Sequence, residues 1–489
     1  MSYSNLTIAT AHHLLQEGKI SPTELVEHCL QRINETDPNI NASITVMKDS
    51  ALVDARLAEQ RLADGEELGM LDGIPLSLKD VVCTEGTRTT AASHILATFI
   101  PPYDATVTQK LKKAGAVLIS KVNTDEFTCG GSTETSAFGT TKNPWDTKKV
   151  PGGSSGGSSA SIAAGHCLGS IGTDTGGSIR LPSAFCNVTG LKVTYGRVSR
   201  FGVISMASSL DSVGPMARSA EDCAYLLEAI AGHDHRDSTT PDVPVKNYSQ
   251  ETKKPFEKMR IGIPQEYFTE ALTPEVKTAV ENAAKEWEKM GCSLVPISLP
   301  YTKYAISVYY VIAPAEISSN MARYDGIRFG PGAKDSSLSL EEYYLQTREQ
   351  GFGDEMKRRI MIGSFVLSAG YYDAYYKKAQ QVRTLISNDF NTAFQAVDVI
   401  LAPVAPFPAF DIGSKSADPL QMYLADALTI PSSLAGIPGL ALPCGFTSDK
   451  LPIGMQLLSP AFTEERLLHL GYHYQQRTNF HLESPTLTV

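Results

Sequence analysis

The hydrophobic and polar positions along the chain change their spacing several times, and each spacing predicts a different element. Residues 25–33 place apolar side chains at helical intervals, and Ser21-Pro-Thr-Glu24 before them has the residues of a capping box, so a helix is expected to begin there. Residues 51–62 repeat the helical pattern. Residues 74–78 instead alternate apolar with other side chains and lead into Lys79, which predicts a strand with that lysine at its end.

Short apolar runs and amphipathic stretches alternate along the remainder of the chain. Strands are expected at residues 116–120, 168–173, 260–264, 293–297, 397–403 and 439–443. Helices are expected at residues 106–114, within 213–230, at 273–290 and over most of the tyrosine-rich section 301–376. Strands that alternate with helices are typical of an α/β fold, so we predict a largely parallel or mixed β-sheet.

We interpret the 489 residues as a single domain in four parts. N-terminal helices occupy residues 1–65, and a core with the candidate chemistry occupies residues 66–230. Residues 233–257 are polar and contain prolines, which indicates a surface connector. Residues 258–489 form the C-terminal part, which is expected to supply residues of the substrate pocket.

The composition is that of a folded globular protein, with 42% hydrophobic and 20% charged residues, so disorder of the whole chain is excluded. The net charge is -10, from 43 Lys and Arg against 53 Asp and Glu. A protein that binds nucleic-acid phosphates by itself is expected to carry an excess of basic residues. Any contact with nucleic acid would therefore depend on a partner.

The cysteines and the N-terminus bear on metal binding and on the location of the protein. The eight cysteines are scattered without the spacing of a zinc site, and we expect free thiols and no metal. The first ten residues lack the basic and apolar segments of a signal peptide. No apolar run reaches the roughly 18 residues that cross a bilayer. These features predict a cytoplasmic protein without a membrane contact.

Two Gly/Ser-rich blocks carry the candidate chemistry, and the first is Pro151-Gly-Gly-Ser-Ser-Gly-Gly-Ser-Ser-Ala160. A flexible linker is disfavoured, because helical and strand patterns follow this block at once. A P-loop is excluded, because Ser158 stands where the phosphate-binding lysine is required. The block also matches G-x-S-x-G, the nucleophile elbow, which requires a downstream histidine. Three histidines near the C-terminus are available for that alternative: His469, His473 and His481.

The second block, Gly172-Thr-Asp-Thr-Gly-Gly-Ser-Ile-Arg-Leu-Pro182, favours Ser178 as the nucleophile. It lies between a predicted strand and a predicted helix start, where backbone N–H groups converge and can stabilise an oxyanion. We expect this oxyanion hole to consist of Thr175, Gly176 and Gly177. A serine nucleophile needs a base, and no histidine lies near either block. Lys79 is the natural candidate, because burial would lower its pKa.

Three motifs in this order resemble the amidase signature family: Ile74-Pro-Leu-Ser-Leu-Lys-Asp80, Gly152-Gly-Ser-Ser-Gly-Gly-Ser158 and Thr173-Asp-Thr-Gly-Gly-Ser-Ile-Arg180. The resemblance implies a single domain with a twisted mixed β-sheet covered by α-helices on both faces. It implies that Ser178 forms an acyl-enzyme and that Lys79 is the base. Ser154 would follow a cis peptide bond and relay the proton of the nucleophile.

The outer segments are most similar to one branch of that family, the A subunits of glutamyl-tRNA(Gln) amidotransferases. They include Ala313-Pro-Ala-Glu-Ile-Ser-Ser-Asn320 and Lys357-Arg-Arg-Ile-Met-Ile-Gly363. This resemblance implies glutamine as the substrate. Arg358 would hold its α-carboxylate, Asp426 its α-ammonium group, and Tyr309 would add a hydrogen bond. The neighbouring Tyr310 is an equal candidate for this hydrogen bond.

The same resemblance implies a complex with subunits B and C. Glutamine hydrolysis would supply ammonia to a partner that converts Glu-tRNA(Gln) to Gln-tRNA(Gln). No cofactor is expected in this chain, and ATP and Mg²⁺ are expected in the partner. Two alternatives stay open: a free-standing amidase for small or aryl amides, with an apolar pocket in place of Arg358 and Asp426, and a non-catalytic scaffold.

Overall fold

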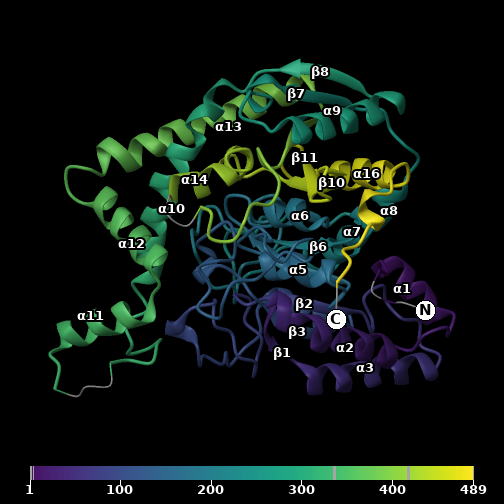
Figure 1. The fold of residues 1–489 in the computed structure, drawn as a ribbon, viewed down its shortest axis with the longest axis horizontal. Helices are drawn as coiled ribbons and strands as arrows, with labels where there is room; N and C mark the ends of the chain where they lie inside the picture. Colours follow the sequence, from purple (N-terminus) through teal and green to yellow (C-terminus); the bar gives the residue numbers. More distant parts are fainter. Residues whose placement is uncertain (1–2, 4, 334–336, 416–418, 488–489) are drawn as a thin grey trace.

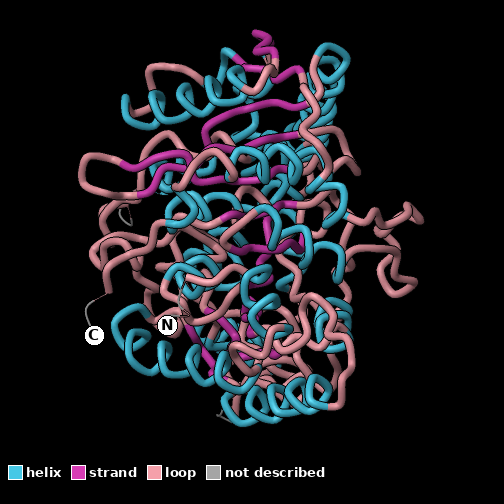
Figure 2. Tube along the Cα trace, turned by 90° about the vertical axis from the view of Figure 1, so that its right-hand side faces the viewer, coloured by secondary structure: helices cyan, strands magenta, loops and turns pink. Residues whose placement is uncertain are grey.

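The computed structural model describes residues 3, 5–333, 337–415 and 419–487. Its strands form one mixed sheet, which Figure 2 shows as a twisted stack that runs through the molecule with helices on both sides. The predicted single α/β domain, with a mixed sheet covered on both faces, is confirmed. Among the described residues, no helix combines the length and the apolar character needed to cross a bilayer.

Eleven strands are found in the described part of the chain, in the spatial order β1-β3-β2-β4-β6-β5-β10-β11-β9-β7-β8. Their bounds are β1 (Ser43–Val46), β2 (Pro75–Lys79), β3 (Val117–Val122), β4 (Gly169–Asp174), β5 (Thr189–Lys192), β6 (Ser212–Ala217), β7 (Arg260–Pro264), β8 (Ser293–Ile297), β9 (Val399–Pro403), β10 (Gly439–Phe446) and β11 (Pro452–Leu458). Parallel pairs join β2 to β3 and β4, and β7 to β8 and β9, whereas the remaining pairs are antiparallel.

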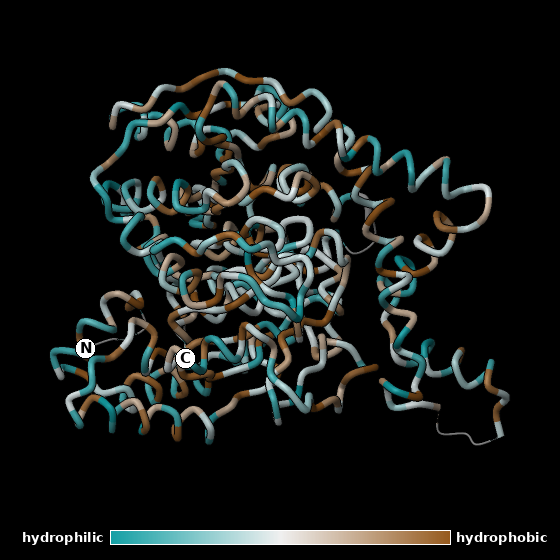
Figure 3. Tube along the Cα trace, turned by 180° about the vertical axis from the view of Figure 1, so that it is seen from behind, coloured by the Kyte–Doolittle hydropathy of each residue, from teal (hydrophilic) through white to brown (hydrophobic). Residues whose placement is uncertain are grey.

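The helices cover this sheet and extend from one side of it (Figure 1). Their bounds are α1 (Ile8–Gln16), α2 (Pro22–Ile40), α3 (Lys48–Ala63), α4 (Thr106–Lys113), α5 (Gly156–Ala163), α6 (Arg180–Cys186), α7 (Ala220–Ile230), α8 (Tyr248–Lys253), α9 (Pro274–Lys289), α10 (Ala305–Met321), α11 (Leu340–Gly351), α12 (Asp354–Leu367), α13 (Lys378–Ala396), α14 (Pro419–Tyr423), α15 (Ile430–Leu434) and α16 (Glu464–Gln475). Figure 3 shows hydrophilic and hydrophobic positions alternating along the outer helices, as expected for helices with one buried face.

The centre of the sheet places the ends of two strands side by side. β2 runs parallel to β4, with Leu78 opposite Ile171, so the carboxyl ends of both strands lie at the same edge of the sheet. Lys79 is the last residue of β2. The loop that contains Ser178 begins directly after Asp174, the last residue of β4. Strand pairing therefore brings the candidate base and the candidate nucleophile to one edge.

Most predicted elements are present, and the differences have local reasons. The capping box at the start of α2 is confirmed, because the Ser21 and Glu24 side chains each accept a hydrogen bond from the other residue's N–H. Four strands were not predicted: β1, β5, β6 and β11. β6 lies at the start of the section 213–230, for which only a helix was expected, and that helix is α7. The predicted connector 233–257 contains α8, which is held by the buried ring of Tyr248 and a hydrogen bond from Arg197 to its hydroxyl.

Candidate active site

The amine of Lys79 lies in a fully buried polar pocket at the end of β2. Its Nζ atom is 2.8 Å from Ser154 Oγ, 2.9 Å from Ser155 Oγ and 2.9 Å from Thr173 Oγ1. Burial lowers the pKa of Lys79 to about 7, against the opposing charges of nearby carboxylates. A large fraction of this lysine is therefore neutral near neutral pH and can accept a proton. The predicted contact between Lys79 and Ser154 is confirmed.

The loop before α5 has the shape needed to present Ser154. The peptide bond between Gly153 and Ser154 is cis, as expected. Asp125 lies directly behind this bond, because a Cβ added to Gly153 would meet its Oδ2 at 2.3 Å. Asp125 itself accepts a hydrogen bond from the Thr133 N–H at 2.9 Å. No side chain larger than hydrogen fits at Gly153, which explains the glycine in the motif.

Ser178 lies in the loop between β4 and α6, close to Ser154 in space. The N–H of Ser155 donates to the carbonyl oxygen of Ser178 at 3.1 Å, which ties the two Gly/Ser-rich blocks together. Within the described residues, the Ser178 hydroxyl has no hydrogen-bond partner, and the side chain is 7% exposed. It is therefore available to a molecule that enters the site.

The backbone of this loop offers unpaired donors. The N–H groups of Gly176, Gly177 and Ser178 have no acceptor within the described part of the chain. Further along, the Ile179 N–H is 3.2 Å from a carboxylate oxygen of Asp174, the last residue of β4. Consecutive unpaired N–H groups beside a nucleophile can stabilise a developing oxyanion. The predicted oxyanion hole stays a prediction, and the geometry is compatible with it.

Two of the three expected substrate residues lie against this loop. A Cβ at Gly176 would be 2.9 Å from the ring of Tyr309, and a Cβ at Gly177 would be 2.8 Å from Asp426 Oδ1. Asp426 is partly buried, and its buried Oδ1 atom has no hydrogen-bond partner among the described residues. Burial raises the pKa of Asp426 to about 7, with a further contribution from the charge of Asp174. An ammonium group placed beside this carboxylate would compensate both effects.

Arg358, the third expected residue, is followed by a second arginine that is more deeply buried. Its side chain is 45% exposed and pairs with Glu355. Arg359 is 3% exposed, donates from Nε to Glu355 Oε1 at 2.8 Å, and lies 5.0 Å and 5.1 Å from the ring centroids of Tyr310 and Tyr423. Its charge also lowers the pKa of Asp426, which places it close to that carboxylate. The sequence analysis did not single out Arg359.

A cavity of about 280 Å³ lies beside these groups. Its lining includes Gly131, Arg358, Arg359 and Tyr423. Gly131 lies between Asp426 and Gly153. A Cβ added to Gly131 would lie 3.5 Å from Asp426 Oδ2, and a Cβ added to Gly153 would lie 2.8 Å from the carbonyl carbon of Gly131. The cavity therefore opens beside the cis peptide bond and carries positive and negative groups in its wall.

The histidines of the alternative nucleophile elbow lie elsewhere. His469 accepts from the Glu257 N–H and stacks on Phe256, and His473 contacts the carbonyl oxygen of Lys254. His481 is buried, which lowers its pKa to about 4. Ser154 contacts the Lys79 amine instead. The nucleophile-elbow interpretation therefore lacks its base.

Comparison with known proteins agrees with this arrangement. A family model described as Amidase matches residues 24–468. The chain belongs to the amidase family. It is 52% identical over 488 residues to the glutamyl-tRNA(Gln) amidotransferase A subunit of Desulfatibacillum aliphaticivorans, with 100% of both chains covered. The family resemblance inferred from the three motifs is thus confirmed.

Solved structures of amidase-family proteins superpose on most of the chain. The glutamyl-tRNA(Gln) amidotransferase A subunit of Thermotoga maritima matches with a TM-score of 0.80 at 38% identity, covering 96% of this chain and 94% of that one. The peptide amidase of Stenotrophomonas maltophilia matches with a TM-score of 0.82 at 31% identity, covering 98% of both chains. This amidase therefore shares its fold with a component of an amidotransferase and with an enzyme named for peptide amides.

Three residues of this amidase that the sequence analysis did not assign support the site. Ser155 and Thr173 complete the contacts of the Lys79 amine. Asp211 is partly buried and accepts a hydrogen bond from the Thr175 hydroxyl at 2.8 Å. A usable signal existed for Thr173, because parallel pairing of β2 and β4 places it near the end of β2. The position of Asp211 could be found only from the folded chain.

Proposed function

We propose that this amidase is the glutaminase component of a tRNA-dependent amidotransferase. Ser178 attacks the side-chain amide of glutamine, glutamate is released, and the ammonia serves a partner protein that converts Glu-tRNA(Gln) to Gln-tRNA(Gln). The observation that carries the proposal is the contact of the buried Lys79 amine with Ser154 beside the loop of Ser178. The 52% identity over the whole length to an amidotransferase A subunit supports the substrate and the pathway of the ammonia.

The proposed reaction begins with a proton transfer. Neutral Lys79 accepts the proton of the Ser154 hydroxyl, and Ser154 accepts the proton of Ser178 as the Ser178 oxygen bonds to the amide carbon. The amide oxygen becomes an oxyanion and receives hydrogen bonds from the N–H groups of the loop, with Thr175, Gly176 and Gly177 as its lining. The proton then moves through Ser154 to the leaving nitrogen, which departs as ammonia.

The second half of the reaction uses the same groups in reverse. A water molecule gives a proton toward Ser154 and Lys79 while its oxygen bonds to the acyl carbon. The bond to Ser178 breaks, the serine regains its proton, and glutamate leaves. One amide bond and one water molecule are consumed, and one ammonia and one carboxylic acid, which then releases its proton, are formed.

Recognition of glutamine is assigned to charged groups in and beside the cavity. Asp426 binds the α-ammonium group, and the Tyr309 hydroxyl adds a hydrogen bond. We assign the α-carboxylate to Arg358, as expected, because its partly exposed guanidinium lines the cavity, whereas Arg359 is buried between two tyrosine rings. These charged groups differ from the apolar pocket that is expected for a free-standing amidase of aryl amides.

The proposal includes subunits B and C as partners, tRNA bound through the complex, and a cytoplasmic location. This chain is proposed to need no cofactor, and ATP and Mg²⁺ are assigned to the partner that activates the glutamate. The net charge of -10 supports this division, because binding of tRNA phosphates favours a basic surface.

The test uses the chain purified together with its partner subunits. Glutamine-dependent formation of Gln-tRNA(Gln) is expected, and Ser178→Ala should abolish it while ammonium chloride still supports the conversion. Loss of both activities in a folded complex would refute the division of labour. Hydrolysis of simple amides without any conversion of Glu-tRNA(Gln) would instead identify a free-standing amidase.

A further inference from the structure

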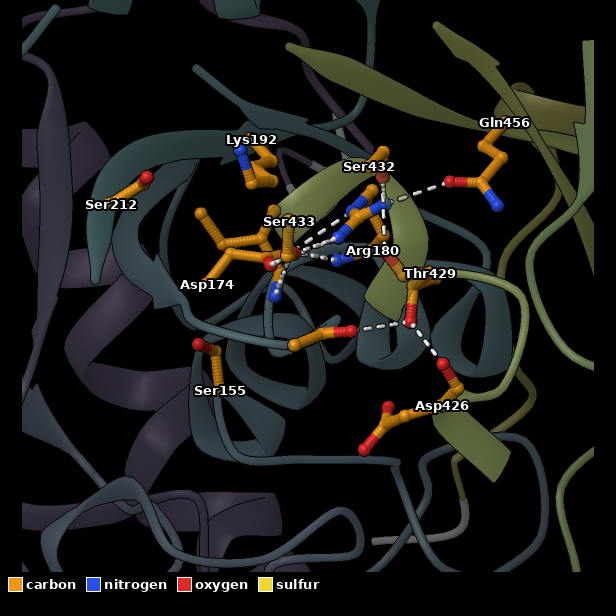
Figure 4. A network of polar contacts seen from close by, with 12 residues as sticks. Ser155, Asp174, Arg180, Lys192, Ser212, Asp426, Thr429, Ser432, Ser433 and Gln456 are labelled. Atoms are coloured by element: carbon orange, nitrogen blue, oxygen red, sulfur yellow. Dashed lines mark hydrogen bonds and ion pairs between the residues drawn. The ribbon is translucent and has the colours of Figure 1, made fainter. Parts of the chain in front are cut away.

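One hydroxyl group joins the loop of the nucleophile to the segment that carries Asp426. Thr429 is fully buried, and its Oγ1 atom donates to the carbonyl oxygen of Gly176 at 2.6 Å (Figure 4). The carbonyl oxygen of Asp426 is 3.1 Å from the same hydroxyl but also accepts from the Thr429 N–H. A hydroxyl has a single proton to donate, so the shorter contact, to the Gly176 carbonyl oxygen, is the hydrogen bond that Thr429 donates.

This hydrogen bond fixes the direction of a neighbouring donor. The peptide bond between Gly176 and Gly177 is trans, and in a trans peptide the C=O and N–H groups point in opposite directions. Holding the Gly176 carbonyl therefore sets the direction of the Gly177 N–H. That N–H has no acceptor within the described residues, and two successive glycines allow this peptide to rotate more freely than other residues would.

The packing around Gly177 leaves no room for a side chain at this position. A Cβ at this position would lie 2.2 Å from Thr429 Oγ1 and 2.8 Å from Asp426 Oδ1, and its φ of +155° is one that other residues rarely adopt. The other end of the loop is held separately, by the hydrogen bond from Thr175 to Asp211. Two side chains outside the loop thus determine how its peptides are oriented.

A second set of hydrogen bonds holds the Thr429 segment against the loop. Arg180, directly after the loop, donates to Ser432 Oγ at 2.6 Å, and Ser432 donates to the carbonyl oxygen of Thr429 at 2.9 Å (Figure 4). The hydroxyl of Thr429 is therefore presented to Gly176 from a segment that is itself anchored. This rigidity is what a positioning role requires.

We propose that Thr429 is a positioning residue that orients the Gly176–Gly177 peptide so that its N–H points at the oxyanion formed on attack by Ser178. Thr429 acts through the backbone and does not touch the substrate. The inference rests on the proposed function, because it assumes an acyl-enzyme at Ser178. It adds that the segment of Asp426, which binds the substrate, also sets the geometry of the oxyanion hole.

The test compares two substitutions in the purified complex. Thr429→Val keeps the shape and removes the hydroxyl, and we expect kcat for glutamine hydrolysis to fall about 10- to 100-fold with KM changed less than about 3-fold. Thr429→Ser keeps the hydroxyl and should stay within about 3-fold of the wild-type kcat. A thermal unfolding midpoint of each variant shows whether it is folded, and Thr429→Ala replaces the valine variant if that one is not.

An inhibitor comparison separates a positioning role from a structural one. Glutamate γ-semialdehyde can form a tetrahedral adduct with Ser178 and so presents an oxyanion, whereas glutamate does not. In Thr429→Val, the inhibition constant of the aldehyde should rise by about the factor by which kcat falls, and that of glutamate should change less than about 3-fold.

Three results would overturn the proposal: a kcat of Thr429→Val within about 2-fold of wild type, a serine variant as slow as the valine variant, or equal rises in both inhibition constants. Failure of the proposed function gives a different result, because the wild-type complex would then not hydrolyse glutamine. In that case the same variants are compared on the amide that the wild type does hydrolyse, and the aldehyde of the corresponding acid replaces the semialdehyde.

Discussion

The Nζ atom of Lys79 lies 2.8 Å from the hydroxyl oxygen of Ser154, and neither side chain is exposed to solvent. Two further hydroxyl groups surround the amine, from Ser155 and Thr173. A buried amine with hydroxyl neighbours loses its proton more readily than one in water, because the charged form is poorly solvated. The catalytic account depends on this property.

Replacement of Lys79 removes the base. Lys79→Ala should lower kcat for glutamine hydrolysis by about 10²- to 10⁴-fold, and Lys79→Arg should not restore it, because a guanidinium stays protonated. The matched control is Lys192→Met. Lys192 is also buried with a pKa lowered to about 7, but it donates to the carbonyl oxygens of Val193 and Ile437. A comparable loss in both variants would contradict a specific role for Lys79.

The pH dependence of kcat should follow the Lys79 amine. The neutral amine is the base, so kcat should rise with pH and level off above the lysine pKa of about 7. At saturating glutamine, the pH dependence of kcat reflects pKa values in the enzyme–substrate complex. The ionisation of Asp426 in the free enzyme therefore does not contribute to it. A profile that is flat from about pH 5 to about pH 9, or one that falls as the pH rises, would rule out a lysine base.

The two neighbouring arginines should differ in their effect on substrate binding. Arg358→Lys should raise KM for glutamine by about 10- to 100-fold, because a lysine cannot replace a bidentate contact with a carboxylate. Arg359→Lys keeps the positive charge beside the tyrosine rings and should change KM less than about 3-fold. Steady-state kinetics of both variants give the comparison, and the reverse order would move the assignment to Arg359.

The buried ion pair next to the nucleophile should be important for stability. Asp174 and Arg180 are fully buried and form two hydrogen bonds at 3.1 Å. Arg180→Met would leave the carboxylate without its partner, so the free energy of unfolding should fall by about 3–5 kcal/mol in urea denaturation. The control is Arg260→Ala, which breaks an exposed pair with Asp398 and should cost below about 1 kcal/mol. Equal losses would argue against this account.

The sequence was sufficient for the parts of the site that depend on motifs and strand ends. Lys79 was placed at the end of a strand, and the structure brings it to Ser154. The choice between Arg358 and Arg359 could not be made in this way, because successive residues on a helix point about 100° apart and both are charged. Burial of Arg359 follows from the packing of α12 against its neighbours, which a local pattern does not contain.

Long-range contacts account for the remaining differences. Thr429 and Gly176 are joined by a hydrogen bond although they are 253 residues apart in the chain. Thr173 reaches the Lys79 amine because β2 and β4 pair in parallel, and Ser155 reaches it from the loop before α5. The tyrosine-rich section was correctly predicted as mostly helical, but which of Tyr309 and Tyr310 borders the loop became clear from the contact of Tyr309 with Gly176.

The most direct test of the central claim is covalent labelling with an electrophilic glutamine analogue, such as a chloroketone, followed by mass spectrometry of the peptides. The account predicts a single label on Ser178, slow or absent labelling in Lys79→Ala and Ser154→Ala, and protection by glutamine. A label on Ser154 or on a cysteine, or an unchanged labelling rate in Lys79→Ala, would contradict it.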